Sequence, residues 1–131
     1  MKILEELAPG DLPPTIGMHS FSGTAHHVGQ LVKFENRNAS STNIYFGFSH
    51  LVNFEMCSSE KSRRQGIDAV RAVPFDRLLA ESDVHSSWDV AVGTAGAISY
   101  LAYALSKPVT EVAIQTAGNG ITFLRNEKPQ R

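Results

Sequence analysis

The chain has 131 residues, of which 42% are hydrophobic and 19% are charged, so it is long enough for one ordinary domain with a buried core. Its 12 Lys and Arg residues and 13 Asp and Glu residues give a formal net charge of -1, which argues against a dedicated polyanion-binding protein. The single cysteine, Cys57, excludes an internal disulfide framework.

The N-terminal segment carries a short apolar pattern. Ile3, Leu4 and Leu7 are spaced like the last turns of an amphipathic helix, so we expect residues 1–14 to be the remnant of a preceding helix and loop. No apolar stretch in this segment has the length of the core of a signal peptide. Together with the lone Cys57, which fits a reducing compartment, this predicts an intracellular location, in the cytoplasm or the nucleus.

Two strand–helix units follow. Residues Thr15 to Ser20 predict the first strand, and apolar residues then recur at helical spacing from Ala25. The second strand is expected at Asn43 to Phe48, where aromatic and β-branched residues follow one another without polar alternation. This composition is typical of a strand that is covered on both faces.

The remaining elements are expected to end in two helices. In chain order they are a loop at Ser49 to Ser59, a helix from about Glu60 to Val73, a strand at Arg77 to Ser82, a helix from about Asp89 to Leu105, and a helix to about Leu124. Ser58 or Ser59 can cap the first of these helices, Pro74 ends it, and Thr110 is the expected N-cap of the last. The uncharged stretch before Lys107 is shorter than the ~20 residues that a membrane span needs, so we expect a buried helix and no membrane association.

Strands that alternate with helices predict an α/β fold with a parallel sheet. We expect one domain over residues 15–125 and a polar tail over residues 126–131. In such folds the side chains that follow the carboxyl ends of the strands gather at one edge of the sheet, where active sites form.

The chemistry at these strand ends is that of a metal site. His19 ends the first strand and Asp83 follows the third. A neutral imidazole and a carboxylate are suitable ligands for a divalent metal ion such as Zn²⁺, Mn²⁺ or Mg²⁺, and a bound metal can activate water near neutral pH. The alternative is that both side chains only cap the helices that follow and satisfy local amide groups.

Other side chains near these ends are candidates for supporting contacts. Glu81 lies two residues before Asp83 and so shares its side of the strand, from which it can orient a ligand. His85 in the same loop and His50 after the second strand are candidates for a ligand or substrate contact. The basic cluster of Lys61, Arg63 and Arg64 can touch phosphates or form a solvated first turn of a helix.

Several motifs resemble one protein family in order and spacing. They are His19-Ser20-Phe21-Ser22-Gly23, the aromatic strand Ile44 to Ser49, the stretch Val73 to Asp83 that ends in Glu-Ser-Asp, and Asn119 followed by Phe123. From Ile16 onward the chain resembles the carboxyl-terminal part of the TatD family of metal-dependent hydrolases, the TatD-type deoxyribonucleases.

This resemblance implies a fold and an activity. The family fold is a (β/α)₈ TIM barrel, of which this chain would form the last three β/α units and a terminal helix. His19 looks like the metal-binding histidine of the sixth strand. Asp83 looks like the catalytic aspartate after the eighth strand, which contacts metal and the attacking water. The implied activity is hydrolysis of ester bonds, with DNA as the implied substrate.

The chain also departs from the family pattern. Asp83-Val84-His85-Ser86 replaces the usual Asp-Ala-Pro-Tyr and resembles a fungal branch with Glu-Ser-Asp-x-His. The later Arg-Asn-Glu-Pro loop is missing, as are the first five strands and the metal ligands that they carry. Because a catalytic metal wants at least three protein ligands, we expect these 131 residues alone to be inactive.

The alternative function is therefore an inactive fragment that serves as an interaction module. A three-stranded sheet cannot close into a barrel, so its first and third strands leave exposed edges. Such edges favour self-association or the binding of a partner chain.

Overall fold

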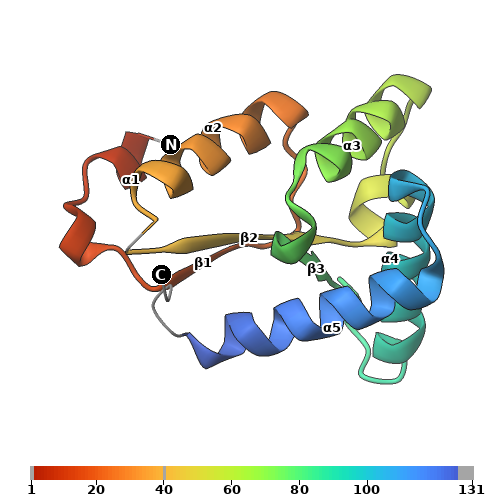
Figure 1. Ribbon diagram of the computed structural model, residues 1–131. Coiled ribbons are helices and arrows are strands. Elements are labelled where there is room, and N and C mark those ends of the chain that lie inside the picture. Colours follow the sequence, from red (N-terminus) through yellow and green to blue (C-terminus); the bar gives the residue numbers. More distant parts are fainter. Residues whose placement is uncertain (1, 40, 127–131) are drawn as a thin grey trace.

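A three-stranded parallel sheet forms the centre of the protein in the computed structural model, which describes residues 2–39 and 41–126 (Figure 1). The strands β1 (Thr15–Met18), β2 (Asn43–Phe48) and β3 (Leu78–Ala80) are ordered β1-β2-β3, and both pairs run parallel. This arrangement confirms the expected α/β class.

Helices cover both faces of the sheet. They are α1 (Lys2–Glu5), α2 (Ala25–Arg37), α3 (Glu60–Ala72), α4 (Val90–Leu105) and α5 (Val109–Arg125), together with the short turns η1 (Pro9–Asp11), η2 (Leu51–Glu55) and η3 (Phe75–Arg77). Helices α2 and α3 lie on one face, and α5 runs along the other (Figure 1). In the described part of the chain, no helix combines the length and the hydropathy that crossing a bilayer requires.

The central strand β2 is buried on both faces, as its composition predicted. Ile44, Phe46 and Phe48 are fully buried and belong to one cluster with the apolar residues of α2 and α3. Tyr45 points to the opposite face, where its ring centroid lies 5.4 Å from that of Phe123 on α5. Burial of each of these large side chains is worth about 1.5–3 kcal/mol, so β2 holds the two helical layers together.

The two outer strands are shorter than expected. β1 stops at Met18 because the backbone of Ser20 turns into the left-handed region, with a φ of 47°. β3 begins only at Leu78 because η3 occupies the preceding residues. The expected loop at Ser49 to Ser59 contains the π-helical turn η2, which the sequence did not indicate.

Two predicted helix starts had different outcomes. Ser59 is the N-cap of α3 and accepts a hydrogen bond from the Ser62 N–H, as predicted. Thr110 is not the N-cap of α5, because the Pro108 carbonyl already accepts the Val112 N–H at 3.2 Å and the helix begins at Val109. The predicted polar tail, residues 126–131, lies outside the described residues except for Asn126.

Asn119 joins α5 to the start of β3. Its side-chain Nδ2 donates to the carbonyl oxygens of Phe75, at 2.9 Å, and Leu78, at 2.8 Å, and the residue is 5% exposed. Asn119→Ala should lower the free energy of unfolding by about 1–3 kcal/mol, because both carbonyls would lose their buried donor. Urea denaturation measures this difference.

Gly118→Ala is the matched control for that substitution. A Cβ at Gly118 meets no atom within 4 Å, and the residue lies in the same helix. Alanine there should raise the stability by about 0.5–1 kcal/mol through helix propensity. Equal stability of Asn119→Ala and the wild-type chain would contradict the role given to this amide.

Candidate metal centre

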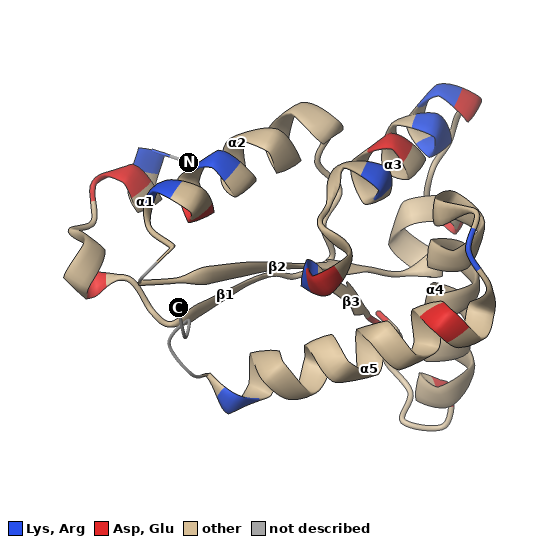
Figure 2. Ribbon diagram, in the orientation of Figure 1, with Lys and Arg blue, Asp and Glu red and all other residues tan. Residues whose placement is uncertain are grey.

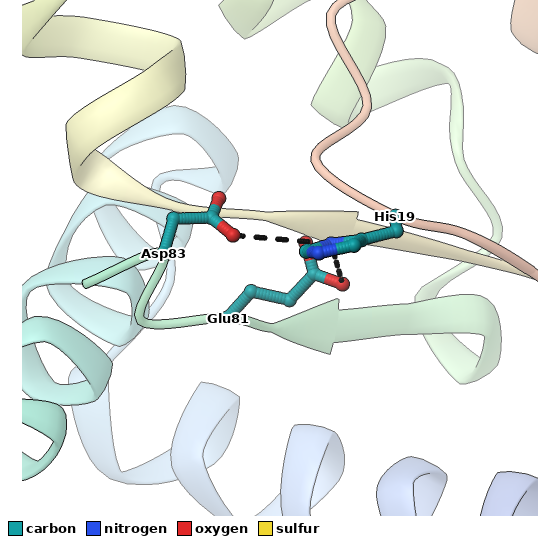
Figure 3. A group of neighbouring side chains, drawn as sticks. All are labelled: His19, Glu81 and Asp83. Atoms are coloured by element: carbon teal, nitrogen blue, oxygen red, sulfur yellow. Dashed lines mark ion pairs between the residues drawn. The ribbon is translucent and has the colours of Figure 1, made fainter. Parts of the chain in front are cut away.

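Three side chains converge at the carboxyl edge of the sheet (Figure 3). His19 follows β1, and Glu81 and Asp83 follow β3, so they come from the two outer strands. The Glu81 N–H donates to the Phe48 carbonyl at 2.9 Å and fixes its backbone to the end of β2. Parallel pairing therefore brings together residues that are more than 60 positions apart in the sequence.

Glu81 reaches His19 by lying across the middle strand. A Cβ built at Gly47 in β2 would overlap the Glu81 carboxylate, so this position has to be glycine for the side chain to lie there. Across this gap the Glu81 Oε1 lies 3.0 Å from the His19 Nδ1. The absent side chain at Gly47 is thus part of the site.

Ser20 ties both carboxylates to the end of β1. Its backbone N–H donates to the Glu81 Oε2 at 2.7 Å, and its hydroxyl donates to the Asp83 Oδ1 at 2.9 Å. Ser20 and Asp83 both have a left-handed backbone, with φ of 47° and 49°. Such conformations cost free energy in non-glycine residues and cluster at functional sites, and here the hydrogen bonds of Ser20 hold them.

The site is negative and only partly open to solvent. The exposed fractions of the side chains are 76% for His19, 22% for Glu81 and 10% for Asp83. The hydrogen bond and the charge of Glu81 raise the pKa of His19 above its ordinary value, and Asp83 adds to this effect. The Asp83 Oδ2 is buried and has no hydrogen-bond donor among the described residues.

These residues fit a divalent cation. The potential ligand atoms of His19, Glu81 and Asp83 all lie within 4.8 Å of one another. The carboxylate at the His19 Nδ1 favours a proton there and leaves the Nε2 with its lone pair, which is how metal-binding histidines are commonly oriented. An unpartnered buried carboxylate oxygen is costly, and a cation beside the Asp83 Oδ2 would remove that cost.

The two other histidines that the sequence indicated do not join this group. The His50 Nδ1 lies 2.8 Å from the Glu55 Oε1, and its ring stacks on Phe54 with centroids 5.1 Å apart. His85 is exposed. Among the described residues, the group that could hold a metal ion consists of His19, Glu81 and Asp83.

Sequence reasoning missed two residues of the site. Ser20 belongs to the His19 motif and Gly47 to the aromatic strand, and the sequence predicted no role for either residue. A glycine inside an apolar strand is a known sign of close approach by another group, and this signal could have identified Gly47. No sequence signal indicated the left-handed backbone of Ser20.

Comparison with known proteins gives one distant similarity. No protein-family model matches the chain. The chain is 26% identical over 113 residues to the Cut9-interacting protein scn1 of Schizosaccharomyces pombe. The match covers 86% of this chain and 30% of that protein, so the chain spans less than a third of the relative's length.

Proposed function

We propose that this chain carries part of the divalent-metal site of a TatD-like metal-dependent hydrolase that acts on ester bonds, with the phosphodiesters of DNA as its substrate. The observation that carries the proposal is the convergence of His19, Glu81 and Asp83 from two strand ends, with a buried Asp83 oxygen that has no donor among the residues described. In this proposal the three strands are the last β/α units of a (β/α)₈ barrel.

Each of the three residues has its own part in the proposed site. His19 and Asp83 would hold the metal ion, which is Zn²⁺, Mn²⁺ or Mg²⁺. Glu81 would act as a positioning residue, because its two oxygens are engaged by the His19 ring and the Ser20 N–H. A bound divalent ion would make a water molecule acidic enough to act as a nucleophile near neutral pH, and Asp83 would be the catalytic residue that positions this water.

The first test is metal binding by this chain. We expect one Mn²⁺ or Zn²⁺ per chain to bind at micromolar metal in isothermal titration calorimetry, and His19→Gln should remove this binding because the amide is a poor ligand for these ions. His26→Gln is the control, since His26 is an exposed histidine on α2. Equal binding by wild type and His19→Gln would contradict the proposed ligand.

The same preparation tests our expectation that the isolated chain is inactive. Three protein side chains, one of them engaged in positioning, leave the metal with fewer ligands than a catalytic site normally has. The metal-loaded chain should therefore hydrolyse bis(p-nitrophenyl) phosphate no faster than the free metal ion does. Turnover that depends on Asp83 would overturn this expectation and would strengthen the proposed chemistry.

The second candidate function is an inactive interaction module, and the name of the relative favours it. That protein is called a Cut9-interacting protein, which describes a protein partner. In the described part of this chain β1 and β3 are the outer strands, and an outer strand can pair with a second copy or a partner strand. No metal uptake by the wild-type chain would favour this candidate over the hydrolase.

A further inference from the structure

A groove with both basic and aromatic walls runs between α3, η2 and α4, apart from the three residues of the candidate metal centre. It consists of two adjoining hollows that share Phe54 and Tyr103. The first hollow, of about 370 Å³, lies against α3 and contains Arg63, Arg64 and Arg71. Figure 2 shows the basic residues spaced along α3, which packs against α4.

The three arginines of the groove are not neutralised. Glu60 and Asp68 line the same hollow, yet within residues 2–39 and 41–126 none of the three guanidinium groups forms an ion pair. The Arg63 guanidinium lies over the Phe54 ring, 4.3 Å from its centroid, and its buried Nε has no acceptor in the described part of the chain.

Arg71 and Arg64 complete the basic wall in different ways. The Arg71 Nε donates to the Ala104 carbonyl on α4 at 2.7 Å, which anchors this guanidinium at the groove. Arg64 makes no contact of this kind and is exposed. An acidic ligand would meet one held guanidinium, that of Arg71, and one free guanidinium, that of Arg64.

The second hollow is apolar. It has a volume of about 360 Å³ and is lined by His50, Phe54, Ser99, Tyr100 and Tyr103. Tyr103 is 71% exposed and Phe54 is 36% exposed, so two aromatic side chains stand open to solvent beside the arginines. Aromatic and arginine side chains are enriched among the residues that contribute most of the binding energy in protein interfaces.

We propose that this groove binds an acidic segment of a partner protein, with one aromatic or leucine side chain in the apolar hollow and carboxylates over Arg63, Arg64 and Arg71. The three arginines favour an acidic ligand, and the adjoining apolar hollow favours a ligand that also carries a large apolar side chain. A nucleic-acid strand fits less well, because the chain has a formal net charge of -1 and so no overall positive charge to attract a polyanion. The proposal does not depend on metal binding and goes beyond the hydrolase.

Selection from a displayed library of random dodecapeptides tests the proposal. The wild-type chain should enrich peptides with an aromatic or leucine residue next to Asp and Glu. Synthetic versions should bind about tenfold more weakly to Arg64→Gln and to Tyr103→Ala, each of which removes an interface residue of the type that dominates binding. Binding should also weaken with added salt, because the charge contribution is screened.

Matched surface variants and a second probe make the result decisive. Lys33→Gln removes a charge from α2, and Ile114→Ala removes an exposed apolar side chain from α5, so both should leave peptide binding unchanged. The proposal would be overturned if no peptides are enriched, or if the enriched peptides bind Arg64→Gln as tightly as wild type. Groove-dependent binding of a labelled oligothymidylate would also overturn it. Arg64→Gln and Tyr103→Ala should bind metal as the wild-type chain does. The peptide-binding proposal and the hydrolase proposal can therefore fail independently of each other.

Discussion

Asp83→Asn is expected to abolish the stabilisation that Mn²⁺ gives to this chain without lowering its stability in the absence of metal. The Oδ1 of Asp83 accepts the Ser20 hydroxyl, and an asparagine carbonyl can accept the same hydrogen bond. Asparagine also tolerates the left-handed backbone that Asp83 adopts, with φ of 49°. The substitution therefore removes the charge and keeps the local structure.

The metal-free protein should benefit from this change rather than suffer. The Asp83 Oδ2 is buried without a donor, and the neutral amide is cheaper to bury there than a carboxylate. At a Mn²⁺ concentration of 100 times the dissociation constant, the wild-type chain should gain about 2.7 kcal/mol from binding, and the variant should gain none.

Urea denaturation with EDTA and with Mn²⁺ measures both quantities in one series. Equal metal-induced stabilisation of Asp83→Asn and wild type would contradict the proposed ligand. In any longer polypeptide that supplies the remaining ligands, the same substitution should remove hydrolytic activity while folding stays intact. Unchanged turnover there would contradict the catalytic part given to Asp83.

The α/β class followed from the sequence because its signals are local. The aromatic run of β2 has no polar alternation, and such a run is stable only between two covering layers. Ser59 caps the start of α3 through its side chain, which accepts the Ser62 N–H, and the proline after Val73 ends the helix because it lacks an N–H, so both ends depend on neighbouring residues alone. The strand ends could therefore be aligned from the sequence, which predicted that His19 and Asp83 lie near each other. In the structure the His19 Nδ1 lies 3.8 Å from the Asp83 Oδ1.

The position of α5 could not be predicted from local signals. Helix spacing shows that residues near Phe123 have an apolar side, but it does not show which face of the sheet receives it. In the structure Phe123 lies against Tyr45 and against the space above Gly17. The face of β2 that carries Tyr45 needs a cover, and α5 supplies it within this chain.

The inner geometry of the site depends on side-chain directions that spacing does not determine. Alternation predicted that Glu81 and Asp83 share a side of the strand, but β3 ends at Ala80 and the left-handed turn at Asp83 changes the direction of the chain before the next helix. The sequence suggested a supporting part for Glu81 without indicating its partner. The structure identifies two partners, the His19 ring and the Ser20 N–H.

Gly47→Ala should disrupt the candidate metal centre from a strand that contributes no ligand. The backbone of Gly47 does not have a positive φ, so alanine fits the strand itself. Its Cβ, however, would occupy the place of the Glu81 carboxylate. Glu81 would have to rotate away and lose its contacts with the His19 Nδ1 at 3.0 Å and the Ser20 N–H at 2.7 Å.

We expect the free energy of unfolding to fall by about 1–3 kcal/mol because the site is overpacked. We expect the Mn²⁺ affinity to fall by about 10–100-fold because His19 loses the carboxylate that orients it. Urea denaturation and metal titration measure them. A double-mutant cycle with Glu81→Ala identifies the cause, because removal of the carboxylate leaves room for the Cβ.

If the overlap with Glu81 is the cause, Gly47→Ala should cost little once Glu81 is already alanine, and the two substitutions should be strongly coupled. Additive losses would mean that alanine disturbs the strand itself and that the Glu81 carboxylate is not held across β2. Because a coupling of this kind needs the two side chains to compete for one place, the cycle tests the geometry of the site even without a bound metal.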